Sequence, residues 1–94
     1  MYQAIYEQLE IGQPAVYQIK FKGNLSSSLS TFKKRFKVTA ETANKRFPVT
    51  MLTGEISGQT ELLEVLIHLN RGGHSIISVA CTEVLARKDD YAQI

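Results

Sequence analysis

The sequence has a single cysteine, almost no excess of one charge and no long apolar run. One thiol, Cys81, cannot form an internal disulfide and finds no second thiol with which to bind a metal. No stretch approaches the roughly 18 consecutive apolar residues of a membrane helix. Glu7 and Glu10 interrupt the first residues, which do not have the layout of a secretory signal. We therefore expect a cytoplasmic protein without a membrane span or a metal site.

The motifs of common catalytic and nucleotide-binding sites are also missing. The stretch TGEISGQTE, residues 53–61, has neither the lysine and glycine spacing of a P-loop nor the three glycines of a dinucleotide site. His68 and His74 are six residues apart, so they do not share a helix face as zinc ligands do. Cys81 lies among β-branched residues, where we expect a buried, inert thiol. No residue is a candidate for catalysis, and we expect a non-enzymatic protein without a cofactor.

Length and composition predict one folded domain. The chain has 94 residues, of which 44% are hydrophobic and 21% charged, as in soluble proteins with a single core. Its net charge of +2 is mild, and its pI near 8.8 lies below the value of about 9 that is typical of nucleic-acid-binding domains. We expect an N-terminal arm at 1–14, a single α+β domain at 15–85 and a C-terminal tail at 86–94.

Hydrophobic periodicity predicts the first two elements of this domain. Residues 15–22 alternate strictly, with Tyr17, Ile19 and Phe21 on one face, which indicates a half-buried strand. Residues 26–36 change to apolar spacings of three and four residues, which indicates a helix. The last turn of that helix is rich in cations, which the helix dipole favours there.

The second half of the domain predicts a hairpin, a helix and a last strand. Residues 37–43 and 47–56 alternate on either side of an Asn-containing turn, with Leu52 and Ile56 pointing to the core. Ser57 is placed to cap a helix over 58–70, a glycine pair ends that helix, and residues 75–84 are rich in β-branched side chains. This order predicts a ferredoxin-like βαββαβ fold, a four-stranded antiparallel sheet with two helices on one face.

Two stretches resemble a group of small uncharacterised bacterial proteins. The early stretch YQIKFKGNLS fits Tyr-x-Ile-x-x-x-Gly-x-Leu, and the later stretch TMLTGEISGQTELLEVLIHLNRGGHSIISV fits Thr-x-Leu-x-Gly-x-Ile-x-x-Gln-x-x-Leu. The resemblance covers residues 17–79. The chain departs from the group at Gly58, where an acidic residue is common, and at Phe32 and Phe36, where the group often has Trp. The resemblance implies the same architecture and carries no activity.

A four-stranded sheet with both helices on one side leaves its other face open. We expect that face to mix aliphatic and polar side chains, as an interface does. The candidate interface residues are Val16, Gln18, Lys20, Val49, Met51 and Thr53. We therefore expect a small interaction or regulatory domain that acts by association. It would form a homodimer through the open face or an edge strand, or bind a protein partner.

Two other functions stay open. A weak nucleic-acid-binding protein would use the basic end of the first helix and the nearby strand, where the candidates are Lys20, Lys22, Lys33, Lys34, Arg35 and Lys37. A small-ligand sensor would need a pocket before the second helix, where the candidates are Gly54, Ser57 and Gln59. The plainer interpretation is that the lysines are a solvated helix end and that the glycine-containing turn only starts a helix.

Overall fold

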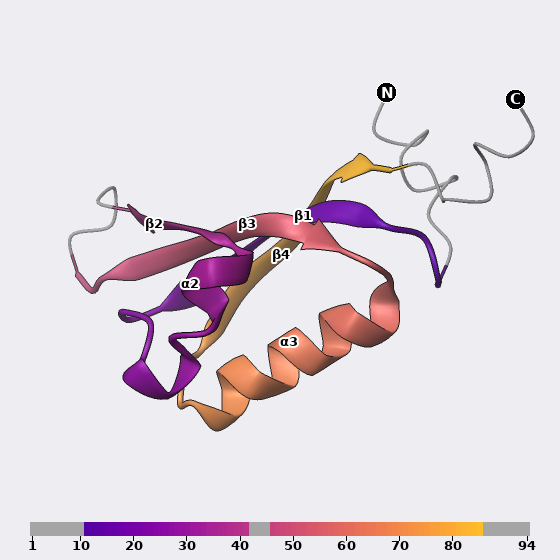
Figure 1. Cartoon of the computed structure of the whole chain (residues 1–94). Coiled ribbons are helices and arrows are strands. Elements are labelled where there is room, and N and C mark those ends of the chain that lie inside the picture. Colours follow the sequence, from indigo (N-terminus) through magenta and orange to yellow (C-terminus); the bar gives the residue numbers. More distant parts are fainter. Residues whose placement is uncertain (1–10, 42–45, 86–94) are drawn as a thin grey trace, which may run out of the picture.

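The computed structural model of the chain describes residues 11–41 and 46–85. A four-stranded antiparallel sheet lies against two helices, so the predicted α+β class is confirmed (Figure 1). The arm up to residue 10, the tail from residue 86 and the hairpin turn at 42–45 lie outside the described residues. The elements are β1 (Ala15–Lys22), the 3₁₀ turn η1 (Ser27–Leu29), α2 (Phe32–Arg35), β2 (Lys37–Glu41), β3 (Val49–Ile56), α3 (Gln59–Arg71) and β4 (Ile76–Val84).

β1 has the alternation that its sequence predicts. It lies between β3 and β4, and its side chains that face the helices are at most 4% exposed. The side chains between them, such as Gln18 and Lys20, are partly exposed on the other face. A two-residue period in the sequence thus becomes one buried and one open face of the sheet.

The single helix predicted over 26–36 is wrong in its extent. The structure has η1 and α2 instead, of three and four residues, and neither has a side-chain cap or an acidic residue in its first turn. Serine and threonine hydroxyls compete for backbone hydrogen bonds and disfavour a helix interior, which explains the break in this serine-rich segment. The predicted apolar stripe nevertheless packs on the sheet, since Leu29, Phe32 and Phe36 are buried.

β2 and β3 form the predicted hairpin, in which Val38 lies opposite Leu52. β3 also pairs with β1, with Ile19 opposite Leu52. Leu52 and Ile56 are fully buried, as predicted. Directly opposed residues of antiparallel strands point to the same side, so these registers assign each side chain to the helix face or to the open face.

α3 follows its prediction to within one residue at each end. Gly58, rather than Ser57, occupies the N-cap position. A Cβ atom at Gly58 would lie 2.8 Å from the carbonyl oxygen of Ile11, so the chain that leads into β1 passes directly against the start of the helix. At the other end, Gly73 has a φ of 85°, the left-handed conformation that a terminal glycine supplies.

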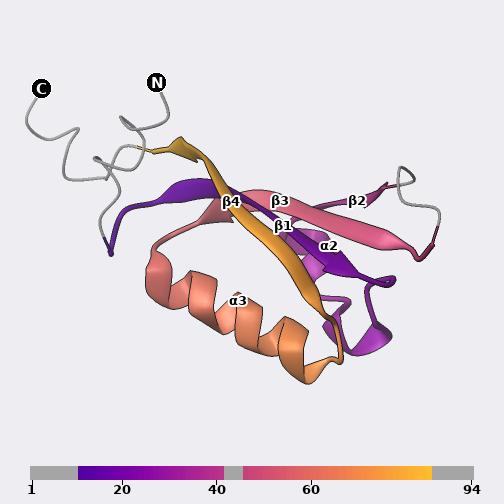
Figure 2. The ribbon, with the colours of Figure 1, turned by 180° about the vertical axis from the view of Figure 1, so that it is seen from behind.

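β4 is an edge strand, because the order of the sheet is β2-β3-β1-β4 (Figure 2). It pairs with β1 through two register irregularities, one between Val16 and Tyr17 and one between Lys20 and Phe21. Most of its side chains are exposed. Cys81 is therefore only partly buried, which corrects the expectation of a buried thiol.

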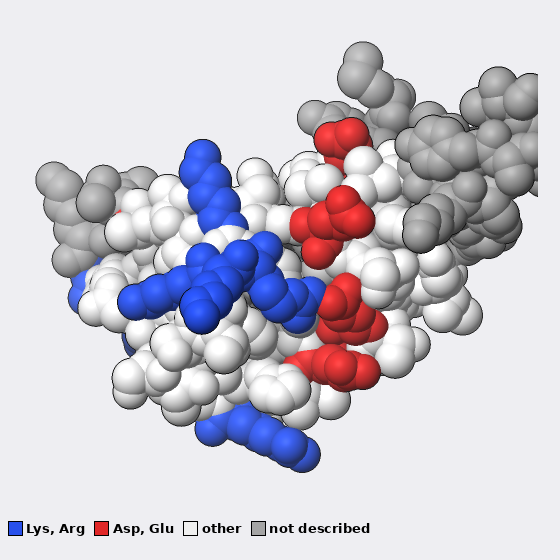
Figure 3. Space-filling model, viewed as in Figure 1, with Lys and Arg blue, Asp and Glu red and all other residues white. Residues whose placement is uncertain are grey.

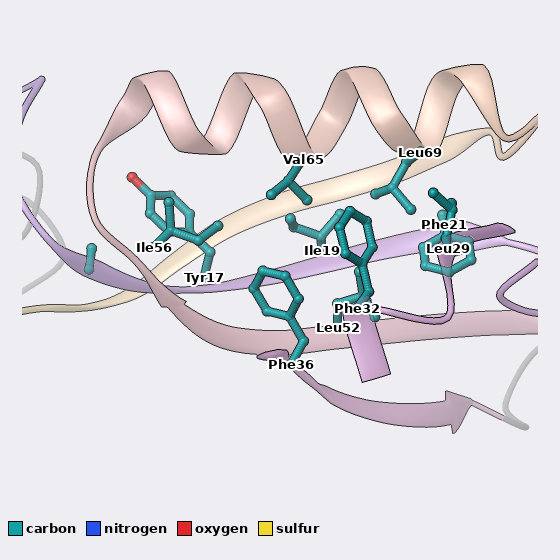
Figure 4. Close-up of a cluster of buried hydrophobic side chains, with 11 residues drawn as sticks. Tyr17, Ile19, Phe21, Leu29, Phe32, Phe36, Leu52, Ile56, Val65 and Leu69 are labelled. Carbon is teal, nitrogen blue, oxygen red and sulfur yellow. The ribbon is translucent and has the colours of Figure 1, made fainter. Parts of the chain in front are cut away.

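The core lies between the sheet and the helices (Figure 4). Its aromatic and aliphatic side chains come from β1, β3, the η1–α2 segment and α3, so both helices pack on the same face of the sheet. Its buried members are Ala15, Tyr17, Ile19, Phe21, Leu29, Phe32, Phe36, Leu52, Ile56, Val65 and Leu69. Within residues 11–41 and 46–85, no helix is long and apolar enough to cross a membrane.

Candidate interaction surfaces

The six residues predicted as an interface lie together on the open face of the sheet. Gln18 is opposite Thr53, and Lys20 is opposite Met51. Val49, on the same face, is opposite Lys22 at the end of β1. Their placement agrees with the sequence pattern, and their use as an interface stays a prediction.

An ion pair spans this open face. The Lys20 Nζ lies 3.1 Å from the Glu41 Oε2, and the two residues come from β1 and β2 with β3 between them. Because Lys20 is opposite Met51 and Glu41 is opposite Val49, the paired side chains reach across the apolar positions of β3. Val49 is only 5% exposed. The open face therefore offers less apolar surface than its strands contain.

The six predicted nucleic-acid residues lie either on α2 or on the open face of the sheet. Lys33 and Lys34 are exposed on α2, where basic side chains gather beside a column of acidic ones (Figure 3). Lys20 and Lys22 lie on the open face of the sheet. Lys37 begins β2 opposite Thr53 and is exposed.

Arg35 is held by neighbouring groups rather than left for a ligand. Its guanidinium forms an ion pair with the carboxylate of Glu61 at the start of α3. Its Cζ also lies 5.0 Å from the centroid of the Phe36 ring. Lys22 is engaged in a similar way, with its Nζ 4.7 Å from the centroid of Phe47. The basic surface that remains consists of Lys33, Lys34 and Lys37.

The three predicted ligand residues each lie against a structural neighbour, and their use as a binding site stays a prediction. The ring of Phe36 packs over Gly54, where a Cβ atom would lie 2.5 Å from its Cδ1. The backbone N–H of Ser57 donates to the Glu61 Oε1 at 2.6 Å, and that of Gln59 donates to the Ile11 carbonyl at 2.7 Å. Two of the backbone donors at this helix start are therefore already engaged.

Glu61, rather than Ser57, supplies the side-chain hydrogen bond that joins the turn before α3 to the first turn of the helix. Its carboxylate accepts from the Ser57 N–H and pairs with Arg35. The hydrogen bond from the Ser57 backbone, followed by the effect of Arg35, holds the pKa of Glu61 below its usual value of 4.5 against the opposing effect of burial. The sequence shows that Glu61 lies in the first turn of α3. Its partners depend on the fold, because Ser57 belongs to the preceding turn and Arg35 to the distant α2.

The two histidines have structural partners. The buried His74 accepts a hydrogen bond at Nε2 from the Ser26 N–H at 3.2 Å, and its Nδ1 lies 3.3 Å from the Lys22 carbonyl oxygen. The exposed His68 bonds through Nδ1 to the Glu64 carbonyl oxygen at 2.7 Å. Among the described residues, no group of three His, Cys, Asp or Glu side chains could hold a metal ion.

The surface that sequence reasoning missed is a strip of exposed apolar side chains on α3 and β4. On α3, Leu63 is 59% and Ile67 is 47% exposed, one helical turn apart. The opposite flank of the helix faces α2, where Glu61 pairs with Arg35 and the His68 ring lies 6.3 Å from that of Phe32. Leu63 and Ile67 therefore lie away from α2 on the exposed side of α3.

β4 continues this strip along the outer edge of the sheet. Ile77 is 50% and Val79 is 40% exposed. Val79 is opposite Ile19, so it points to the helix side, where α3 runs beneath β4 (Figure 2). The strip of Leu63, Ile67, Ile77 and Val79 is here termed the apolar edge surface. The sequence held no signal for it, because an apolar stripe does not reveal which of its flanks the fold leaves uncovered.

The edge of β4 can also offer backbone groups to a partner. The strand has nine residues with one charge, Glu83, and in the described sheet it pairs on one side only, with β1. The other edge strand, β2, has five residues and carries Lys37 and Glu41. Charged side chains and short length protect an edge from pairing, and β4 is longer and less charged than β2.

Comparison of the chain with protein-family models, curated proteins and solved structures finds no match.

Proposed function

We propose that the chain is a cytoplasmic, non-enzymatic interaction domain that associates with itself through the β4 edge. The apolar edge surface is the observation that carries this proposal. Four large apolar side chains that are 40–59% exposed lie beside a long strand edge with a single charge. Contiguous exposed apolar surface marks sites of association, and an exposed strand edge pairs readily with another strand.

The edge is a better interface than the open face of the sheet. On the open face, Lys20 and Glu41 pair across β3 and Val49 is nearly buried, so a partner would have to displace an ion pair to reach little apolar surface. At the edge, the backbone groups of β4 and the side chains of Ile77 and Val79 are accessible together. Backbone pairing supplies affinity there, and the apolar side chains supply burial.

Sedimentation equilibrium of the wild-type chain and of Val79→Lys tests the proposal. We expect the wild type to sediment at twice the mass of the 10.5 kDa chain and Val79→Lys to sediment as a monomer. Val38→Lys is the matched control, because Val38 is 37% exposed on the other edge strand. It should leave the dimer intact. A monomeric wild type, or a dimer that survives Val79→Lys, would overturn the proposal.

We further propose that the fold is ferredoxin-like. The order β2-β3-β1-β4 with antiparallel neighbours supports this assignment, since β3 separates β1 from β2 and β1 separates β3 from β4. Each strand–helix–strand unit is thereby split by a strand of the other, as in the split βαβ arrangement. The η1–α2 segment takes the place of the first helix in a shortened form.

A second candidate function is the binding of single-stranded nucleic acid. The exposed Lys33, Lys34 and Lys37 favour it, since within the described residues none of the three is in an ion pair. Fluorescence anisotropy with a labelled oligonucleotide at two salt concentrations tests it. Affinity should fall steeply with salt, and the double variant Lys33→Ala/Lys34→Ala should reduce the salt dependence, because fewer counterions are released. Arg71→Ala is the control, and an affinity indifferent to salt would exclude this function.

A further inference from the structure

We infer that the dimer is an antiparallel pair of β4 strands related by a two-fold axis that passes through Val79. This inference rests on the proposed function and adds the identity of the partner, its direction and its register. We infer that the partner is a second copy of the chain, because the side chains of β4 complement those of another β4 strand that runs in the opposite direction.

The faces of β4 restrict the possible registers. Val79 and Cys81 lie opposite Ile19 and Tyr17 and so face the helix side, whereas Ser78 and Ala80 face the open side. Opposed residues of an antiparallel pair point to the same side, so a two-fold axis normal to the sheet must pass through a residue and not between two. The regular part of β4 between its two irregularities runs from Ser78 to Cys81, and Val79 and Ala80 lie at its middle.

Side-chain chemistry decides between these two centres. An axis at Ala80 would set Ile77 opposite Glu83, so that Ile77 would have no apolar partner on the other copy. An axis at Val79 sets Val79 opposite itself and Ile77 opposite Cys81, so that the two most exposed apolar side chains of β4 each meet an apolar partner. The second arrangement removes apolar surface from water without burying a charge, and it is the favoured one.

The charges along β4 fit the same axis. With the centre at Val79, Glu83 of one copy lies opposite Ser75 of the other. Ser75 is next to Lys22, whose N–H donates to the Ser75 carbonyl at 2.8 Å. Glu83 is opposite Val16, so both Glu83 and Lys22 are on the open face. One strand would separate the two, a spacing at which Lys20 and Glu41 form an ion pair, so Lys22 would exchange its contact with the Phe47 ring for Glu83 of the other copy.

The helices complete the interface. An axis normal to the sheet keeps the helices of both copies on the same side, so α3 of each copy runs beneath the joined edges. Leu63 and Ile67 lie exposed on the side of α3 away from α2, and we expect them to approach their counterparts across the axis. The pairing joins two four-stranded sheets into one and covers the whole apolar edge surface.

Cysteine cross-linking tests the register. Ile77→Cys, which keeps Cys81, should give a disulfide-linked dimer on oxidation, because opposed Cα atoms lie about 4.5–5.5 Å apart, within disulfide range. Val79→Cys/Cys81→Ser should do the same through one self-pair. The wild type is the control, because its two Cys81 residues would lie four residues apart along the strands, about 13 Å. A wild type that cross-links as readily as Ile77→Cys would overturn the register.

Charge reversal is an independent test on the open face. Lys22→Glu and Glu83→Lys should each raise the dimer Kd by about threefold to tenfold, because each places like charges together at two symmetric positions. The double variant should return to the wild-type Kd. If both single variants and the double variant bind alike, the antiparallel pairing is wrong.

The two proposals fail in different ways. If Val79→Lys leaves the sedimentation of the chain unchanged, association through the β4 edge is wrong altogether. If Val79→Lys abolishes the dimer while neither cysteine variant cross-links and the charge swap does not restore affinity, only the two-fold register is wrong. Thermal melting of each reduced variant by circular dichroism verifies that loss of the dimer is not loss of the fold.

Discussion

The Nε2 of His74 accepts a hydrogen bond from the backbone N–H of Ser26, 48 residues earlier in the chain. The same ring packs on Phe21, with centroids 4.5 Å apart, and its Nδ1 reaches the carbonyl of Lys22. Because the Ser26 N–H can only donate, Nε2 must be the unprotonated nitrogen and Nδ1 must carry the proton. One imidazole thus joins the end of β1, the start of the η1 segment and the turn after α3.

His74→Ala is therefore expected to destabilise the fold by about 2–4 kcal/mol, since it removes packing on Phe21 and leaves the partly buried Ser26 N–H without its acceptor. His68→Ala is the control, because His68 is exposed, and its effect should stay within about 0.5 kcal/mol. Urea unfolding followed by circular dichroism measures both variants. Equal losses for the two would contradict the role assigned to His74.

Gly54→Ala is expected to destabilise the protein by about 1–3 kcal/mol, because the new methyl group would overlap the ring of Phe36. Gly12→Ala is the matched control, since a Cβ at Gly12 meets no atom within 4 Å. Chemical denaturation of the two variants gives the comparison. A Gly54→Ala protein as stable as the wild type would show that Phe36 does not pack closely over β3.

The hydrogen bond and the ion pair of Glu61 predict that the free energy of unfolding depends on pH. Its pKa is lower in the folded chain than in the unfolded chain, so its contribution to stability is present above the unfolded pKa and is lost as pH falls through the folded pKa. Glu61→Gln should lower the unfolding free energy at pH 7 by about 0.5–1.5 kcal/mol. The difference in unfolding free energy between Glu61→Gln and the wild type should vanish in acid. Glu64→Gln, on an exposed position of the same helix, should show no such pH-dependent difference.

The α3 flank of the apolar edge surface gives a prediction that separates association from stability. Leu63→Glu/Ile67→Glu should raise the dimer Kd at least tenfold. Full burial of one aliphatic side chain contributes about 1.5–3 kcal/mol to association, which corresponds to a change in Kd of at least that size. The melting temperature of the monomer should hardly change, because both side chains are exposed in the single chain. Val38→Glu, on the β2 edge, is the control. A dimer that tolerates the double variant would show that α3 takes no part.

The sequence predicted the parts of the fold that depend on local periodicity. The alternation of β1, the hairpin of β2 and β3 and the apolar period of α3 each specify an element and its buried face, and the structure has all three. The helix predicted over 26–36 was too long, because its apolar spacing is helical while its serines disfavour a helix. Periodicity reports which side chains are buried and not how much of the backbone is helical.

The candidate surfaces depend on relations that periodicity does not contain. The six open-face residues could be predicted, because alternation alone assigns them to one face. The apolar edge surface could not, because the exposure of Ile77 and Leu63 depends on the position of β4 in the sheet and on the lateral placement of α3. The pairing of Arg35 with Glu61, 26 residues apart, likewise depends on tertiary packing.

The unequal edges of the sheet also determine how far association can proceed. Joining β4 to β4 uses the long, nearly uncharged edge of both copies and leaves β2 at each outer border. β2 is short and carries Lys37 and Glu41, so a third chain would meet charged side chains and few backbone groups. A sheet with two edges like β4 could grow without limit into a fibre. With a single such edge, assembly closes at two chains.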